Sequence, residues 1–386
     1  MEPTLKVGLA GLGSVSRTIL YNIQNIENVQ LTAVADVRQE PLERARAQFG
    51  VETYESVEAM CESSNVDAVW VCTPNLFHTE HTIIAAEHGK HVICEKPMAI
   101  TLEQAQEMVD VVDRTGIRYV QGHSKIFDPP VRRMREIVSS GEIGRLIQLN
   151  NWTYKPWVSG QPRLDTEVDF RIGGGALYRQ GPHQTDVVRG IGGGMVKSVR
   201  ATVGRHNPDF PMAEGNFSAF LEFEDGAVAT MAFNGYGYLD ITELTWGIGE
   251  GGQMRAEGPR QHFTGAVETD VKYDWAMRDD HRERTEERTK QPFYGLTVAS
   301  CEGGDIRQSP DGLYLYDHDG RKEVPLPPKG HGRGELIEMR NALMEERATF
   351  PDARWGMATL EVILAMRESS DTGREVTLSH QVPCLY

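Results

Sequence analysis

Short apolar runs alternate with amphipathic stretches over the first third of the chain, and this alternation limits the possible folds more than any other feature. Apolar runs of strand length occur at residues 5–10, 30–36, 67–72, 91–95 and 117–122. Helical patterns lie between them at 14–27, 40–49, 76–89 and 101–115. Strands that are apolar on both faces and separated by helices predict a doubly wound parallel sheet with right-handed crossovers.

The patterning changes after about residue 125. Runs that alternate apolar and polar residues follow at 146–154, 198–206, 217–223 and 228–235, with helical patterns near 175–190, 331–347 and 353–369. Alternation is typical of strands with one face buried and the other in water. We therefore expect an α/β protein of two domains. Residues 1–125 form the parallel sheet, and residues 126–386 form an α+β domain on an open, mostly antiparallel sheet, with an exposed insertion at about 248–292.

A glycine-rich turn joins the first strand to the first helix. Gly11 permits a tight turn, and Gly13 lets the backbone approach a pyrophosphate at the helix N-terminus. Asp36 ends the second strand, where it can accept both ribose hydroxyls of NAD and would repel the extra phosphate of NADP, a preference that Arg38 could soften. The pattern predicts a Rossmann site for NAD, with NADP as an alternative. Its expected residues are Gly11, Leu12, Gly13, Ser14, Val15, Asp36 and Arg38.

Two more motifs follow apolar strands. Thr73-Pro74-Asn75 comes after the run at 67–72, and Glu95-Lys96-Pro97 comes after the run at 91–95. Ligands of open parallel sheets bind at the carboxyl ends of the strands, so we expect both motifs on the cofactor side. The further cofactor-binding residues are Thr73, Pro74, Asn75, His78, Glu95 and Lys96. His78 shares a helical face with His81 but no third ligand is evident, so we expect no metal site.

Charge and cysteine usage limit the partners and the compartment. The chain has 40 basic and 56 acidic residues, a net charge of −16, which argues against nucleic acid or an anionic membrane as partners. A local basic pocket can still bind an anionic substrate. Five cysteines without a paired spacing indicate a reducing compartment, and we see no signal peptide and no apolar run of membrane-spanning length. We expect a cytoplasmic protein.

Stretches along nearly the whole chain resemble the Gfo/Idh/MocA oxidoreductase family. They are residues 8–17, 72–81, 89–99, 140–146, 173–193 and 359–378. The resemblance implies an N-terminal Rossmann domain and a C-terminal domain whose open sheet often forms the interface of a homo-oligomer, here a dimer or tetramer. Other stretches are most similar to the phthalate dihydrodiol dehydrogenase subgroup, which implies an anionic cyclic cis-diol as substrate. These are residues 122–130, 183–189, 234–240 and 294–316.

The resemblance also implies roles for single residues. The lysine of the Glu-Lys-Pro motif is catalytic in this family, which implies Lys96, and a histidine of the second domain implies His183 as general acid/base. The resemblance implies a catalytic group of an aspartate, a histidine and a lysine. Arg179 stands at the position of the aspartate, so this chain lacks that carboxylate. Arg179 and His183 are one helical turn apart and share a face, so Arg179 should meet either a protein carboxylate or an acidic group of the substrate. We favour the substrate, because the motif itself supplies no carboxylate. Asp186 orients His183 or packs at a domain interface.

The expected substrate-binding residues come from several parts of the second domain. They are Arg179, His123, Tyr154, Arg171 and Asp186, with Lys155 and Arg163 as additional charges or exposed loop residues.

Three functions are compatible with these residues. The first is an NAD(P)-dependent dehydrogenase that acts on a small cyclic hydroxylated substrate (a sugar, a polyol or a cis-dihydrodiol) carrying an acidic group. The second is an NAD-dependent glycosidase that cleaves an anionic glycoside by transient oxidation and elimination. The third is a non-catalytic ligand sensor, against which the presence of Lys96 and His183 argues.

Overall fold

The computed structural model describes residues 4–122, 124–255, 262–269, 271–272, 290–327 and 333–386. The chain divides into two compact units. The first consists of Met1–Ser124 and Gly330–Leu360, and the second of Lys125–Lys329 and Glu361–Tyr386. The second unit differs from the expected domain of residues 126–386, because the chain returns to the first unit after residue 329.

The first unit is built on a six-stranded, fully parallel sheet of order β3-β2-β1-β4-β5-β6. The strands are β1 (Leu5–Ala10), β2 (Val29–Ala35), β3 (Glu52–Tyr54), β4 (Ala68–Val71), β5 (His91–Glu95) and β6 (Tyr119–Gly122). Five of the six match the predicted apolar runs. The short β3 was missed because its three residues are polar or partly exposed and carry no strand pattern.

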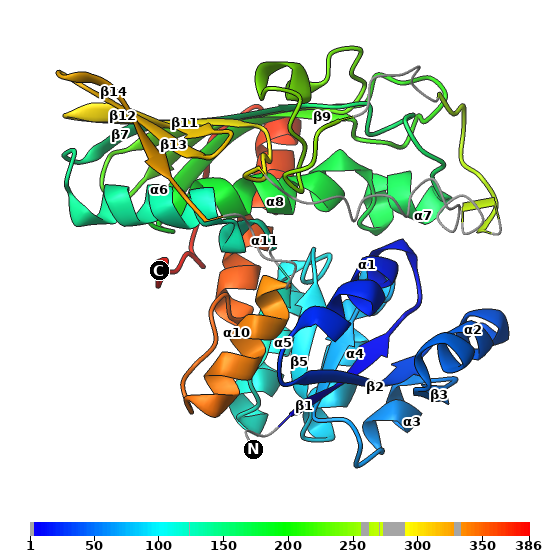
Figure 1. Ribbon diagram of the computed structural model, residues 1–386. Helices are drawn as coiled ribbons and strands as arrows, with labels where there is room; N and C mark the ends of the chain where they lie inside the picture. Colours follow the sequence, from blue (N-terminus) through cyan, green and yellow to red (C-terminus); the bar gives the residue numbers. More distant parts are fainter. Residues whose placement is uncertain (1–3, 123, 256–261, 270, 273–289, 328–332) are drawn as a thin grey trace. The chain divides into compact units, whose positions relative to one another are not determined.

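Helices connect these strands (Figure 1). They are α1 (Ser14–Asn22), α2 (Gln39–Phe49), α3 (Val57–Cys61), α4 (His78–Glu87) and α5 (Leu102–Thr115), with the short 3-10 helices η1 (Ile23–Asn25) and η2 (Asn75–Phe77). Local signals set their ends: Thr101 caps α5 by accepting from Gln104 N, and Gly116 closes it in the left-handed conformation. In the returning segment, α10 (Gly334–Met344) packs against β5 and β6.

The second unit is built on a nine-stranded sheet of order β14-β13-β12-β11-β7-β10-β9-β8-β15. All neighbours pair antiparallel except β10 and β7, which are parallel. The strands are β7 (Leu146–Tyr154), β8 (Val196–Gly204), β9 (Asn216–Phe223), β10 (Val228–Asn234), β11 (Leu296–Cys301), β12 (Gly304–Ser309), β13 (Gly312–Asp317), β14 (Gly320–Pro325) and β15 (Val376–Thr377). The open, mostly antiparallel sheet is as predicted.

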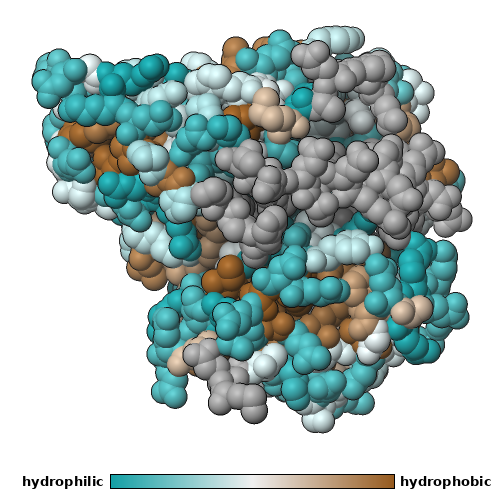
Figure 2. All heavy atoms as spheres, viewed as in Figure 1, coloured by the Kyte–Doolittle hydropathy of each residue, from teal (hydrophilic) through white to brown (hydrophobic). Residues whose placement is uncertain are grey.

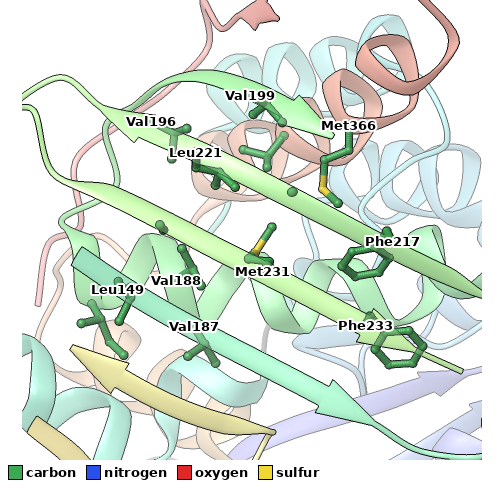
Figure 3. Close-up of a cluster of buried hydrophobic side chains, with 14 of the residues drawn as sticks. Leu149, Val187, Val188, Val196, Val199, Phe217, Leu221, Met231, Phe233 and Met366 are labelled. Carbon is green, nitrogen blue, oxygen red and sulfur yellow. The ribbon is translucent and has the colours of Figure 1, made fainter. Parts of the chain in front are cut away.

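Helices cover one face of this sheet (Figure 1). They are α6 (Pro129–Ser140), α8 (Gly175–Gly192) and the second-unit part of α11 (Ala353–Thr372). Between the sheet and these helices lies the apolar core, in which Val187 and Val188 of α8 and Met366 of α11 meet Leu221 and Met231 of the sheet (Figure 3). This core anchors α8, the helix that carries both Arg179 and His183.

Smaller elements precede α6 and α8 and follow β10. These are η3 (Ser124–Phe127), α7 (Asp165–Val168), η4 (Phe170–Ile172) and η5 (Ile241–Leu244). Within the predicted insertion at 248–292, residues 256–261, 270 and 273–289 lie outside the described residues.

Charged and polar side chains cover much of the surface visible in Figure 2. Across the described residues, no helix has the length and apolar character that a membrane crossing requires.

Candidate active site

The glycine turn after β1 needs a residue without a side chain at Gly11. Its φ is +91°, and a Cβ there would lie 2.9 Å from the carbonyl oxygen of Cys72 and 3.0 Å from Cα of Thr73. Its amide donates to Ala35 O at 2.8 Å. The turn is therefore held between the ends of the neighbouring strands β2 and β4, and only glycine fits there.

Open space lies next to the turn at Gly13. A Cβ built on Gly13 meets nothing within 4 Å, and no side chain caps the start of α1 there. Leu12 is partly exposed, Val15 is exposed, and Ser14 begins α1. Ser16 is buried and donates to Gly13 O at 2.6 Å, which ties the first turn of α1 to the glycine turn. This cradle of backbone amides fits a dinucleotide pyrophosphate.

Asp36 is already engaged by the protein. Its carboxylate accepts from Leu12 N at 2.7 Å, from Arg38 N at 3.0 Å and from the Arg38 guanidinium at 2.9 Å through both Nε and Nη2. Arg38 also donates to Leu12 O at 3.1 Å. Asp36 thus stands where a ribose is expected, but its charge is paired, which weakens the repulsion of an additional phosphate.

The Thr73-Pro74-Asn75 segment joins β4 to α4 and is only partly buried. Thr73 Oγ1 lies 2.9 Å from Nδ1 of His81, and Asn75 begins η2. His78 is 1% exposed, and its two ring nitrogens lie 2.8 Å from Pro97 O and 2.9 Å from Thr73 O. The expectation that His78 lines the cofactor is therefore corrected: its ring contacts two backbone segments of the protein.

The Glu95-Lys96-Pro97 motif begins on the last residue of β5. Glu95 and Pro97 are buried and Lys96 is partly exposed, with a cis bond between Lys96 and Pro97. Burial raises the pKa of Glu95, and the charges of Arg333 and Lys96 oppose that shift. Arg333 Nη2 lies 3.4 Å from Glu95 Oε1. The motif presents Lys96 at the carboxyl end of the parallel sheet, as predicted for a residue beside a bound dinucleotide.

In the second unit, His183 lies beside an aromatic ring that two lysines also contact. The centroids of the His183 and Tyr294 rings are 5.2 Å apart. Lys125 Nζ and Lys155 Nζ each lie 5.3 Å from the Tyr294 centroid. Both lysines contact Glu250: Lys125 donates to its carbonyl oxygen at 3.2 Å, and Lys155 pairs with its carboxylate. His183 thus belongs to a group that contains two positively charged side chains, one of which is Lys155.

A second charged cluster surrounds Glu167, and we call it the Glu167 cluster. Arg179 Nη2 lies 3.2 Å from Glu167 Oε1, Lys272 Nζ 3.2 Å from Oε2, and Arg163 Nη1 3.9 Å from Oε1. Arg163, Lys272 and Glu167 are buried, whereas the Arg179 side chain is 23% exposed. Of the two partners left open for Arg179, a protein carboxylate is therefore present, because Glu167 of α7 supplies one from outside the motif.

The titration behaviour of the Glu167 cluster reflects crowded positive charge. Burial would raise the pKa of Glu167, but the charges of Arg179, Lys272 and Arg163 lower it to about 2. Burial, together with the neighbouring cations, lowers the pKa of Lys272 to about 8 and that of Arg163 to about 9. Each cation is thus less favourable in the protein than in water, although a carboxylate lies within 4 Å.

The remaining predicted residues have different surroundings. Asp186 is completely buried and accepts from Ile126 N at 3.0 Å, so it supports η3 and is corrected from a substrate ligand to a structural residue. Arg171 is exposed and binds Asp169 through both Nε and Nη2. Tyr154 is partly exposed at the end of β7. His123 lies outside the described residues.

Two family models match the chain, one on each side of residue 124. A model described as an oxidoreductase family with an NAD-binding Rossmann fold matches residues 5–123, and a GFO/IDH/MocA C-terminal domain matches residues 131–242. The chain belongs to the GFO/IDH/MocA oxidoreductase family. It is an NAD-dependent oxidoreductase whose first unit is the NAD-binding Rossmann domain.

Individual members of the family are similar over nearly the full length. A crystal structure of a dehydrogenase from Bordetella bronchiseptica RB50 is 32% identical, with a TM-score of 0.85, and the match covers 97% of this chain and 100% of that one. The 1-carboxy-3-chloro-3,4-dihydroxycyclohexa-1,5-diene dehydrogenase of Comamonas testosteroni is 28% identical, over 94% of both chains. The 2,7-anhydro-N-acetylneuraminate hydratase of Escherichia coli is 26% identical, over 88% of this chain and 86% of that protein.

Several residues of the candidate site have no signal in the sequence that assigns them a role. Glu167, Glu250 and Lys272 lie in segments without a motif. Lys125 and Tyr294 lie in the stretches 122–130 and 294–316, whose resemblance to the dihydrodiol dehydrogenase subgroup implied no role for either residue. Their partners are distant along the chain, since Lys125 and Glu250, which contact each other, are 125 positions apart. No local spacing could therefore have indicated them. Among the described residues no group of three or more potential ligands could hold a metal ion.

Proposed function

We propose that this protein is an NAD-dependent dehydrogenase that oxidises a hydroxyl group of a small cyclic substrate carrying an acidic group. The observation that carries the proposal is the Glu167 cluster: a partly exposed arginine, oriented by a buried carboxylate and backed by two buried cations, one helical turn before His183. A guanidinium fixed in this way binds a carboxylate of the substrate more strongly than it binds a neutral hydroxyl group of the substrate.

The lysines beside Tyr294 support the same substrate class. Lys125 and Lys155 both lie next to the ring that His183 contacts, and the carboxylate of Glu250 pairs with Lys155. Positive charge near His183 favours an anion there even though the whole chain carries a net charge of −16.

The proposed chemistry assigns a role to Lys96 and a role to His183. NAD held by the glycine turn at Gly11–Gly13 and by Asp36 would supply the hydride acceptor for this oxidation. Lys96 donates a hydrogen bond to the oxygen of that hydroxyl and stabilises the negative charge that develops on it. His183 takes up the hydroxyl proton. The products are a carbonyl compound, NADH and a proton.

The similarity to the Comamonas protein supports the cyclic substrate. Its name describes a ring that carries one carboxyl group and two neighbouring hydroxyl groups. Such a molecule offers the carboxylate that Arg179 would bind and a hydroxyl group that can be oxidised.

A redox-neutral reaction is the second candidate. The similarity to the Escherichia coli protein, which is named as a hydratase, favours it. In this case the substrate would be an anionic sugar derivative or glycoside, and the hydride would return from the cofactor before the product leaves. The residues proposed above would bind the same acidic group.

The experiment is a substrate panel monitored by NADH absorbance together with product analysis. Carboxylated cyclic cis-diols are compared with their amides, and with inositols, aldoses and carboxylated glycosides. We expect NADH release with a carboxylated diol and at least tenfold lower kcat/KM with its amide, because a charged hydrogen bond contributes about 1.5–3 kcal/mol. Arg179→Ala should abolish that difference, whereas Arg145→Ala, which removes an exposed ion pair with Glu302, should preserve it.

Two results would contradict the proposal. Equal turnover of acid and amide would exclude the acidic group as a determinant. Conversion of a glycoside or sugar derivative without net NADH would replace the dehydrogenase by the second candidate.

A further inference from the structure

Lys96 is the exposed member of a tripeptide whose other two residues are buried. Glu95 is 8% exposed and Pro97 is also buried, while the Lys96 side chain is partly accessible. Each buried neighbour has a contact that comes from another part of the first unit. Both contacts join the tripeptide to other segments of the first unit.

On one side, Arg333 binds the side chain of Glu95. Arg333 Nη2 lies 3.4 Å from Glu95 Oε1, and the guanidinium carbon lies 5.1 Å from the centroid of the Trp70 ring on β4. Arg333 precedes α10 in the segment that returns to the first unit, 238 positions after Glu95. A buried carboxylate requires a counter-charge, and Arg333 supplies it.

On the other side, His78 contacts the backbone of Pro97. Its Nδ1 lies 2.8 Å from Pro97 O, and its Nε2 lies 2.9 Å from Thr73 O. The ring therefore lies between the segment that carries Lys96 and the segment that follows β4. A protonated ring donates to both carbonyl oxygens and a neutral ring to one. Burial lowers the pKa of His78 to about 4, so near pH 7 the ring is neutral and donates a hydrogen bond to one of these two carbonyl oxygens.

We propose that Arg333 and His78 are positioning residues for Lys96. They hold the backbone on both sides of the lysine, so that its ammonium group points in one direction from the end of β5. The inference rests on the proposed catalytic role of Lys96 and assigns the returning segment a part in catalysis. Displacement of a catalytic group by about 1 Å can reduce turnover about a hundredfold.

The test compares variants of the two residues with matched controls. Arg333→Gln and His78→Gln remove the contacts, and Arg333→Lys keeps the positive charge next to Glu95. Arg340→Gln removes another arginine of the returning segment, one that donates to Glu27 O, and His88→Gln changes an exposed histidine that ends α4. For each variant we would measure kcat and KM with the carboxylated diol, the Kd for NAD, and the melting temperature.

A second readout follows Lys96 itself without turnover. Reductive methylation by formaldehyde, with cyanoborohydride as the reductant, is quantified at Lys96 by peptide mass spectrometry and reports how the amine is presented. Lys96→Ala shows whether the lysine is required at all.

We expect Arg333→Gln and His78→Gln to lower kcat at least tenfold, with a less than threefold change in the Kd for NAD and an altered methylation rate at Lys96. Arg333→Lys should recover part of kcat, and both controls should behave as the unmodified protein. Lower melting temperatures with unchanged kcat in folded protein would overturn the inference, because both residues would then be structural only. If Lys96→Ala itself retained activity, the proposed function of the lysine would fail instead.

Discussion

Replacing Glu167 by glutamine tests the Glu167 cluster directly. Glutamine preserves the shape of the side chain and an oxygen that can accept from Leu164 N, which now donates to Glu167 Oε2 at 3.0 Å. It removes the charge that Arg163, Arg179 and Lys272 share. The substitution therefore removes the negative charge of Glu167 and keeps the hydrogen bond that its side chain accepts from Leu164 N at the start of α7.

Two quantities indicate how much free energy of unfolding Glu167→Gln removes. The lowering of the pKa of Glu167 from 4.5 to about 2 corresponds to about 3 kcal/mol of preference for the charged form. Because the folded pKa is below the unfolded one, this stabilisation is present above pH 4.5 and is lost as the pH falls toward 2. Removing one partner of a buried ion pair costs about 3–5 kcal/mol. We expect Glu167→Gln to lower the free energy of unfolding by about 3 kcal/mol at pH 6.

The free energy of unfolding that Glu167→Gln removes should become smaller as the pH rises. Lys272 is charged below its pKa of about 8, and without Glu167 that pKa falls further. At a pH between the pKa of Lys272 in the variant and its pKa in the unmodified protein, folded variant binds fewer protons than folded unmodified protein. The destabilisation by Glu167→Gln therefore decreases by about 1.4 kcal/mol per pH unit until about pH 8. At pH 9 the variant should therefore be closer to the original than at pH 6.

Urea denaturation at pH 6, 7 and 9 measures this cost. Glu302→Gln is the matched control, because it removes a half-exposed carboxylate whose partner, Arg145, is also exposed, and exposed pairs contribute about 0–1 kcal/mol. Benzoate at ten times its Kd should restore about 1.4 kcal/mol to the Glu167 variant, and benzamide should restore less. A pH-independent loss, or equal rescue by benzoate and benzamide, would refute the reasoning about crowded positive charge.

Three further results are expected from the first unit. Lys96→Ala should abolish turnover with a nearly unchanged Kd for NAD, and retention of most of the activity would show that the motif is structural. Asp36→Ala should shift the ratio of the NADP and NAD dissociation constants toward NADP, because it removes the facing charge and releases Arg38 from its hydrogen bonds; an unchanged ratio would contradict this. Gly11→Ala should lower the melting temperature because its Cβ meets Cys72 O at 2.9 Å, whereas Gly13→Ala should weaken NAD binding at constant stability; equal melting temperatures of these two variants would be inconsistent with the geometry of the turn.

Most of the first unit was predictable because its signals are local. All of its strands except β3 are apolar runs, and the glycine turn, Asp36 and the Glu-Lys-Pro motif all follow strand ends. Backbone conformation and burial on both faces act over a few residues, so they leave a pattern that is visible in the chain. The antiparallel nature of the second sheet was predictable from the alternation in β7, β9 and β10 for the same reason.

Strands β11–β14 and the return of Gly330–Leu360 to the first unit left no comparable pattern. β14 is exposed almost throughout, and its residues are held as a strand by pairing with β13. Such pairing depends on hydrogen bonds between backbones, which place few demands on side chains at the edge of a sheet. The division of the chain into units likewise depends on contacts between distant segments.

The charged residues around the candidate site also depend on contacts between distant segments, which the sequence does not reveal. Lys96, His183 and Arg179 could be selected because each stands in a motif. Their partners could not: Glu167 reaches Arg179 from another helix, Lys272 approaches Glu167 from a distant segment, and Arg333 reaches Glu95 from 238 positions away. An ion pair forms wherever folding brings opposite charges within about 4 Å, whatever their separation along the chain. Residue type and spacing therefore identify the reactive groups, and the folded chain assigns the groups that hold and tune them.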